Sequence, residues 1–218
     1  MTVVELAFPV LGNLLPKDHA YDLYAAISRI LDDHLPTDVG ISPIRGISLG
    51  ISGIQITRTS RLRVRIPAER IGELLPLAGK FLNVGEHQVG LGVPEVRALE
   101  AAPSLTARIV TIKGYQDPES FLVALERQMA GLGVQGRVSL PIFDDGPRKG
   151  EHRRRVVKIK NRTVVGFTVR IDELSDRDSY ELLVHGLGGR RHMGCGIFFP
   201  DHEQAEEPND RAIASRQK

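Results

Sequence analysis

The two halves of the chain repeat one order of predicted elements, and this repeat constrains the fold more than any other feature. In the first half, an apolar segment of strand character at 2–10 precedes an amphipathic helix that Asp18 caps and that extends to His34. Segment 44–57 alternates loosely and contains Gly46, Gly50 and Gly53. Segment 61–66 alternates charged and apolar residues as a strand does, and a second helix is predicted from 67 to 79. The half ends with strand segments at 81–84 and 88–91 around a turn at Gly85.

The second half gives the same order of strands and helices. A strand at 105–114 precedes a helix at 117–132, with Asp117 as its N-cap and Gly133 at its end. A later helix at 175–184 has Ser175 as its N-cap. Further strand segments lie at 134–140, 156–160, 163–171 and 196–199, and a tight turn is predicted at Asn161 and Arg162.

Each half therefore follows the order strand, helix, strand, strand, helix, strand, and the second half has one extra strand. This order is typical of a four-stranded antiparallel sheet with two helices on one face. The sequence predicts an α+β protein of two tandem ferredoxin-like (RRM-like) βαββαβ domains with a C-terminal glycine-rich loop. The predicted domains span 1–94 and 95–200, and a flexible tail is predicted at 201–218. A single domain with one mixed sheet is the alternative.

Basic residues gather in two places, although the formal net charge is only +2. Segment 148–162 holds eight Lys or Arg residues and one acid, Glu151. Such clustering in a nearly neutral chain indicates a local site for a polyanion. In segment 61–66, Arg61, Arg63 and Arg65 share one face of the predicted strand. That face fits a solvent-exposed row of charge and a nucleic-acid contact equally well.

A glycine-rich segment runs from Gly186 to Pro200 and follows a predicted helix. It contains the glycines and basic residues Gly186, Gly188, Gly189, Arg190, Arg191, His192, Gly194 and Gly196. Backbone N–H groups of such a loop can converge on an anion, and arginines add bidentate phosphate contacts. A phosphate-binding P-loop is excluded because Cys195 stands where its Lys is required. A dinucleotide fingerprint is excluded because Arg191 replaces its third glycine. RNA or a protein partner remains, and a plain helix C-cap and turn is the alternative.

Cysteine content and hydropathy indicate the compartment and the absence of a cofactor. Cys195 is the only cysteine, so no intramolecular disulfide can form and a reducing compartment fits. The N-terminus lacks the basic region of a signal peptide, and no apolar run approaches the length of a membrane span. Histidines are scattered without the spacing of a metal site. We therefore expect a cytoplasmic protein with no metal, no cofactor and no membrane partner.

The C-terminal segment also resembles a known family. A helix that ends in GLGGRR and continues as HMGCGIF is similar to the C-terminal signature of the CRISPR RAMP superfamily. The resemblance covers about residues 2–200 and is closest to its crRNA-maturation endoribonucleases of the MYXAN-type subgroup. It extends to HAYDLYAAISRIL, GISPIRG, LAGKFLNVGEHQVGLGVPEVRAL, TARIVTIKGYQDPESFL and RRRVVKIKNRTVVGF.

The resemblance implies a tandem ferredoxin-like fold and an endoribonuclease that cuts CRISPR repeat RNA in the precursor transcript. Cleavage in such enzymes needs no metal: the ribose 2′-OH attacks the adjacent phosphate and leaves a 2′,3′-cyclic phosphate and a 5′-OH. The expected partners are repeat RNA, mature crRNA and other subunits of a Cascade-type interference complex. Two alternatives remain, namely a non-catalytic RNA-binding subunit of that complex and an unrelated ferredoxin-like module that binds a small anion.

The resemblance also implies roles for individual residues. The catalytic residues would be His34, just after the first helix, Tyr24 on that helix, and Arg45, where family members often carry a Lys. His34 could instead be a packed helix-end residue, Tyr24 fits the core, and His19 is the rival histidine. The RNA-binding residues would be Arg153, Arg154, Arg155 and Lys158 together with the glycines and basic residues of the 186–196 segment. A solvated strand edge is the alternative for Arg153 to Arg155.

Overall fold

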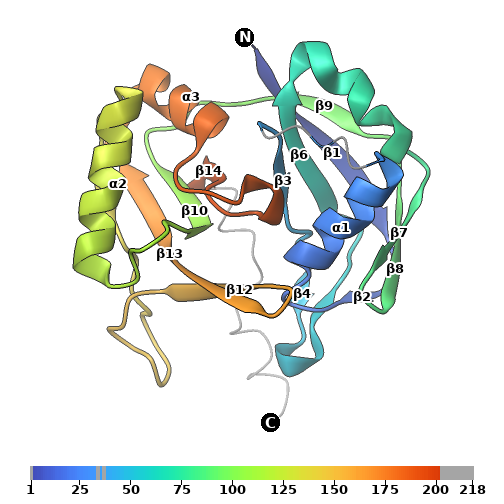
Figure 1. The fold of residues 1–218 in the computed structure, drawn as a ribbon, viewed down its shortest axis with the longest axis horizontal. Coiled ribbons are helices and arrows are strands. Elements are labelled where there is room, and N and C mark those ends of the chain that lie inside the picture. Colours follow the sequence, from blue (N-terminus) through green and yellow to red (C-terminus); the bar gives the residue numbers. More distant parts are fainter. Residues whose placement is uncertain (1, 33–34, 36–37, 202–218) are drawn as a thin grey trace. The chain divides into compact units, whose positions relative to one another are not determined.

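The computed structural model describes residues 2–32, 35 and 38–201. The chain divides into two compact units, with the division between Ala98 and Leu99 (Figure 1). The predicted boundary after residue 94 lies just before the last strand of the first unit. Within the described ranges, no helix has both the length and the apolar character needed to cross a membrane.

In its described residues, the first unit has a six-stranded antiparallel sheet with one α-helix, α1 (Ala20–Ile30), packed on it. The strand order is β3-β6-β1-β8-β7, and the last strand, β9, also pairs with β1. The strands are β1 (Val3–Leu11), β3 (Gly40–Ser42), β6 (Arg61–Pro67), β7 (Phe81–Val84), β8 (His87–Leu91) and β9 (Glu95–Ala98). A smaller sheet, ordered β2-β5-β4, contains β2 (Leu14–Leu15), β4 (Ile47–Ser48) and β5 (Ile54–Gln55), with a short 3-10 turn η1 (Gly50–Ser52) between β4 and β5.

Helix α1 begins and ends at residues other than those predicted. Its N-cap is His19 and not Asp18, and no side chain caps it. The imidazole of His19 is buried: Nδ1 donates to the Pro16 carbonyl at 2.6 Å, and Nε2 accepts from the Ile44 N–H at 3.0 Å. These two bonds fix the chain where the helix starts. The helix ends at Ile30, so the prediction that it continues to His34 was too long.

The second predicted helix of this unit consists of 3-10 helix. Two pieces, η2 (Ala68–Glu73) and η3 (Leu75–Leu77), occupy the predicted place. Pro76 lies inside this segment, and a proline there removes a backbone donor and disfavours a continuous α-helix. Leu74 and Leu77 are buried in the core. The helical segment was predicted in the right place, but its 3-10 type was not.

The second unit has a five-stranded antiparallel sheet of order β11-β13-β10-β14, and β12 pairs with β13. The strands are β10 (Leu105–Val110), β11 (Arg137–Ser139), β12 (Arg154–Ile159), β13 (Arg162–Asp172) and β14 (Phe198–Pro200). Two helices, α2 (Pro118–Leu132) and α3 (Asp176–His185), pack on the sheet around Phe121, Phe167 and Leu182.

Both predicted caps are present in the second unit. Asp117 accepts from the Ser120 N–H at 2.9 Å, and Ser175 accepts from the Asp178 N–H at 3.1 Å. Gly133 ends α2 in the left-handed conformation, as its position predicted. The tight turn between β12 and β13 lies one residue earlier than predicted, because Ile159 pairs with Arg162 and leaves Lys160 and Asn161 as the turn.

Both sheets share the strand arrangement of the ferredoxin-like fold. Numbering the core strands in chain order within each unit gives 2-3-1-4, which is β3-β6-β1-β8 in the first unit and β11-β13-β10-β14 in the second. The two strands that enclose the first helix are separated by the third strand in each case. The predicted fold class of two tandem ferredoxin-like units is confirmed.

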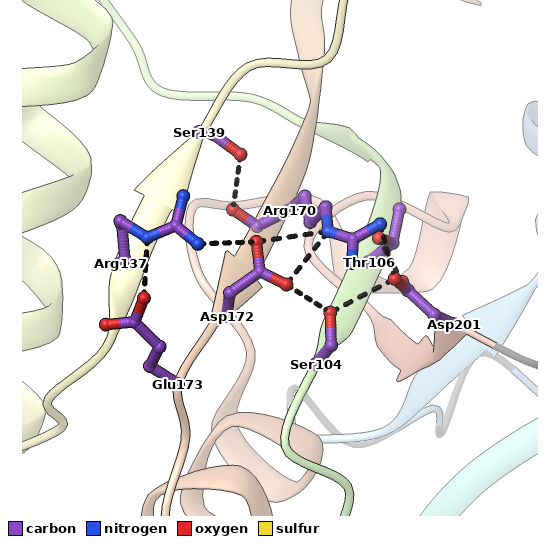
Figure 2. A network of polar contacts seen from close by, with 8 residues as sticks. All are labelled: Ser104, Thr106, Arg137, Ser139, Arg170, Asp172, Glu173 and Asp201. Carbon is purple, nitrogen blue, oxygen red and sulfur yellow. Dashed lines mark hydrogen bonds and ion pairs between the residues drawn. The ribbon is translucent and has the colours of Figure 1, made fainter.

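The last described residue, Asp201, is held by a polar network on the second sheet (Figure 2). Thr106 donates to its carboxylate at 2.6 Å, Ser104 donates at 3.0 Å, and Arg170 forms an ion pair at 2.7 Å. Arg170 and Ser104 also bond Asp172, at 2.9 and 2.6 Å. Although the predicted tail starts at residue 201, Asp201 itself is fixed to strands β10 and β13.

Candidate nucleic-acid interface

The glycine-rich segment connects α3 to β14 and lies against the end of β10 (Figure 1). Gly188 and Gly196 both have positive φ, of 76° and 69°. A Cβ on Gly188 would lie 2.5 Å from the Thr111 carbonyl oxygen, and one on Gly196 would lie 2.0 Å from that of Leu187. Any side chain at these positions would push the loop away from the sheet. These two glycines therefore serve the close packing of the loop.

The backbone amides of the loop bond to the protein. The Gly188 N–H donates to Gln128 Oε1 at 2.7 Å, the Gly189 N–H to the Thr111 carbonyl at 3.0 Å, and the Gly196 N–H to the Ile109 carbonyl at 2.8 Å. The amides of residues 186, 187, 193, 194 and 195 also donate to backbone carbonyls. Eight amides of the loop therefore bond to the protein itself, which does not fit the expectation that they converge on an anion.

The basic side chains of the loop have different surroundings. Arg190 is exposed and adopts the left-handed conformation, with φ of 65°. Arg191 is half-buried, and its Nη1 donates to the His185 carbonyl at the end of α3. His192 is also half-buried, in a short 3-10 turn, η4 (Arg191–Met193). The loop thus presents Arg190 outward and uses Arg191 to attach itself to α3.

An open pocket of about 480 Å³ lies beside this loop, within the second unit. Its walls come from the segment after β10, the start of β13, Gln128 on α2, and the glycine-rich loop. Among the described residues, three exposed cations line it, namely Lys113, Arg162 and Arg190, and no acidic residue does. The full lining is Thr111, Ile112, Lys113, Gly114, Gln116, Gln128, Arg162, Thr163, Val164, Val165, Gly188, Gly189 and Arg190.

The arrangement of this pocket suits a phosphate ester. Three cations around a cavity whose described lining contains no carboxylate create a positive potential that attracts a polyanion. Gln128 uses its Oε1 to hold Gly188, so its amide N–H groups are the remaining donors of that side chain. A bound nucleotide would therefore contact positive charge from three different segments of the chain. It would also contact the Gln128 amide N–H groups, whose orientation is fixed by the bond to Gly188.

The hairpin of β12 and β13 extends the basic surface. Arg154 and Lys158 are exposed on β12. Arg155 is half-buried and donates from Nε to Thr168 Oγ1 at 3.4 Å, across the hairpin. Arg162, which lines the pocket, begins the other strand of the same hairpin. The hairpin thus connects the basic run seen in the sequence with the pocket beside the loop.

Arg153 belongs to a different environment from Arg154. Its guanidinium donates to the Ile142 carbonyl at 2.8 Å and to Asp144 at 2.9 Å. It also lies 5.9 Å from the centroid of the Phe143 ring. These contacts tie Arg153 to the loop that precedes β12, so its charge is partly neutralised.

The predicted catalytic residues lie in the first unit. His34 lies outside the described residues. Tyr24 is half-buried and packs against the core cluster of this unit. Arg45 is half-buried, and its carbonyl accepts from Ser60 Oγ at 2.6 Å. The rival histidine, His19, is 2% exposed with a bond at each ring nitrogen, which leaves no lone pair accessible to a substrate.

The arginine row of β6 is neither a solvent-facing edge nor an open contact surface. Glu5 on β1 lies opposite Arg65 in the strand register and is buried. Its carboxylate is 2.5 Å from Arg63 Nε and 3.6 Å from Arg65 Nε, and Arg65 is itself buried. Both interpretations of this row were therefore wrong for Arg63 and Arg65. The signal for this pairing was Glu5 itself, the lone acid within an apolar strand.

Sequence reasoning missed the other walls of the pocket. Lys113 and Gln128 stood only in segments interpreted as strand end and helix. Arg162 was part of the basic run 148–162, but it was placed in a turn and not at a pocket. These residues come together only in the folded chain. The one signal in the sequence was the pair Lys113-Gly114 directly after an apolar strand, a position where a lysine is usually exposed. Within the ranges that the structure describes, no three His, Cys, Asp or Glu side chains are grouped as a metal site.

Comparison with known proteins identifies the relatives of this chain. The family model described as Cas6 Crispr matches residues 4–203. The CRISPR-associated endonuclease Cas6 of Myxococcus xanthus (strain DK1622) is 39% identical over 201 residues, which are 92% of this chain and 82% of that protein.

Solved structures share the fold at low identity. A CRISPR-associated Cas6 protein superposes with a TM-score of 0.61 and 14% identity, over 91% of this chain and 98% of its own. A RAMP protein described as binding different RNA substrates superposes with a TM-score of 0.59 and 13% identity, over 91% and 98% of the two chains. At this identity the likeness supports the fold alone.

Proposed function

The chain belongs to the Cas6 Crispr family and is an endonuclease, and we propose that it binds CRISPR repeat RNA in the precursor transcript and cuts it to release mature crRNAs. The first unit carries the catalytic residues in this proposal, and the second unit holds the RNA. Other subunits of a Cascade-type complex are its proposed protein partners. The Myxococcus relative, named a CRISPR-associated endonuclease, supports the assignment.

The pocket beside the glycine-rich loop is the observation that carries the RNA part of this proposal. RNA affinity depends on phosphate neutralisation, and Lys113, Arg162 and Arg190 surround a cavity with no acid in the part of its lining that the structure describes. Arg154 and Lys158 continue the positive surface along the hairpin. The glycines position this surface: their close packing fixes the loop, and the fixed loop places Arg190 at the pocket.

The proposed reaction is a transesterification without a metal ion. A base removes the proton of the ribose 2′-OH, the 2′ oxygen bonds to the adjacent phosphorus, and the bond from phosphorus to the 5′ oxygen breaks. An acid gives the leaving 5′ oxygen its proton, so the products are a 2′,3′-cyclic phosphate and a 5′-OH. A histidine suits either proton transfer because its pKa lies near neutrality. We assign a proton-transfer role to His34, with Tyr24 and Arg45 as supporting groups.

Cleavage of cognate repeat RNA in the presence of EDTA tests the reaction. We expect one cut per repeat, products that end in a cyclic phosphate, and no cut when the 2′-OH at the scissile position is replaced by hydrogen. His34→Ala should bind the RNA and fail to cut it, whereas His87→Ala, in the same unit, should cut at the normal rate. Normal cutting by His34→Ala would refute the assignment of His34, and binding without any cleavage by the native protein would indicate an RNA-binding subunit.

Salt dependence of RNA affinity tests the pocket separately. The logarithm of the RNA association constant falls linearly with the logarithm of the salt concentration. Each phosphate contact that is lost should make this negative slope shallower by about 0.7–0.9. We expect this loss in Lys113→Ala, Arg162→Ala and Arg154→Ala. Arg97→Ala is the control, since Arg97 is paired with Glu95 at 2.5 Å on β9. Unchanged slopes in the first three variants would show that the pocket and hairpin do not contact the RNA backbone.

A further inference from the structure

An exposed aromatic ring lies on the sheet of the first unit, in a row of three residues across adjacent strands. Phe81 on β7 is opposite Gly90 on β8, and Gly90 is opposite Leu11 on β1. Phe81 and Leu11 are each 66% exposed, while their strand neighbours Leu82 and Val10 are buried. The row therefore lies on the side of the sheet that faces away from the core. On that side, Phe81 and Leu11 do not contribute to core packing.

The ring of Phe81 leans across the glycine. A Cβ on Gly90 would lie 3.2 Å from Phe81 Cε1 and 3.5 Å from Cδ1, so the ring occupies the space that a side chain at position 90 would take. One side of the ring is thus supported by the strand, and the other remains accessible. An aromatic ring supported in this way is a flat apolar surface that is fixed before any ligand binds.

Polar groups border this surface on two sides. The next row along the same face pairs Asn83 with Gln88, and Gln88 Nε2 donates to Asn83 Oδ1 at 3.2 Å. That bond uses one donor and one acceptor, and the Asn83 amide N–H groups and the Gln88 carbonyl oxygen retain capacity for further bonds. Lys80 precedes Phe81 and is exposed. The acid nearest in sequence, Glu86, is in the turn at the other end of β7.

We propose that Phe81 is a stacking platform for an unpaired nucleobase of bound RNA, with Asn83 and Gln88 bonding the base edge and Lys80 contacting a phosphate. The proposal rests on RNA being the ligand of this protein, and adds a contact surface on the first unit. Single-stranded RNA is recognised by base stacking on aromatic side chains and by hydrogen bonds to base edges. The row of Phe81 and Leu11 spans about two strand spacings, roughly 10 Å. An apolar patch of this size fits a single base better than it fits the apolar centre of a protein interface.

The absence of tryptophan from the sequence provides a direct assay. Phe81→Trp places a single indole on the platform, and its fluorescence reports stacking. We expect saturable quenching by single-stranded oligoadenylate and none by an abasic oligonucleotide of equal length. Leu75→Trp in η3 is the control, because Leu75 is 50% exposed in the same unit but is not part of this row, and it should not respond. Equal quenching by the abasic strand, or in the control, would overturn the proposal.

The same samples separate this proposal from the proposed function. If labelled repeat RNA binds Phe81→Trp by fluorescence anisotropy without quenching the indole, the platform is refuted and the function stands. If oligoadenylate quenches the indole and repeat RNA does not bind, the platform stands and the function fails. Failure of both RNAs to bind would overturn both.

Affinity provides the second test. Phe81→Leu keeps an apolar cover over Gly90 and removes the ring, so it should weaken oligoadenylate binding by about fivefold to a hundredfold. Phe81→Tyr should retain native affinity. An unchanged unfolding midpoint in Phe81→Leu, expected for so exposed a residue, would assign the loss to stacking. Native affinity in Phe81→Leu would overturn the proposal.

Discussion

Replacement of Gly196 by alanine should destabilise the second unit strongly, because the added methyl group causes both backbone strain and a steric clash. A residue other than glycine in the left-handed region costs about 1–2 kcal/mol. The new Cβ would also lie 2.0 Å from the Leu187 carbonyl oxygen, and relief of such overpacking costs about 1–3 kcal/mol. Together the costs reach about 2–5 kcal/mol, which corresponds to a fall in Tm of roughly 4–20 °C for a chain of this size.

Gly189→Ala is the matched control for this prediction. Gly189 is in the same loop, but no heavy atom lies within 4 Å of the position that its Cβ would take. Its unfolding free energy should change by no more than about 0.5 kcal/mol, as for an ordinary surface substitution. Thermal unfolding followed by circular dichroism measures both variants. A native Tm for Gly196→Ala, or an equal fall for Gly189→Ala, would refute the packing role of the loop glycine. Because Gly189 lines the pocket, a loss of RNA affinity at native Tm would place RNA at Gly189.

Two further predictions concern charged groups on the sheets. Burial raises the pKa of Asp172, but hydrogen bonds from Ser104 and Arg170 outweigh it, so the pKa lies below its ordinary value of 3.8. The carboxylate therefore stabilises the fold above about pH 4, and this contribution is lost as pH falls through the lowered pKa. In Asp172→Asn the decline of Tm between neutral and acidic pH should be shallower than in the native protein, and an identical profile would contradict the assignment. Glu5→Gln leaves Arg63 and Arg65 without their buried counter-charge and should cost about 3–5 kcal/mol. Urea unfolding measures this, and an unchanged midpoint would show that the buried pair contributes nothing.

Regular patterns in the sequence predicted the architecture of both units because each element satisfies its own local rules. Helix α2 has a cap at Asp117, an apolar stripe that includes Phe121, and a left-handed glycine at its end. Every one of these signals acts within a few residues, so it can be recognised without tertiary structure. The start of α1 depends instead on the bond from the Ile44 N–H to His19, which joins residues far apart in sequence. Local reasoning therefore placed the cap one residue too early.

The candidate site was predictable in part for the same reason. The glycine-rich segment and Arg154 stand out in the sequence, because clusters of glycine and of positive charge are local properties. The pairing of Arg65 with Glu5 follows from strand register, which composition cannot reveal. The role of Gln128 depends on which loop packs against α2. Contacts of this kind require the fold, so the sequence could not supply them.

The glycine-rich signature and the RNA-binding charge are separable properties of this fold. The glycines and their amides are committed to the protein, and Gly188 and Gly196 fit only because they lack side chains. We propose that affinity for phosphate comes from side chains around the loop, above all Lys113 and Arg162, which lie outside the signature. A chain that keeps the glycines and loses these two cations would close the same loop over a pocket with little attraction for RNA. In this proposal the glycines close the loop, and the cations that line the pocket hold the RNA.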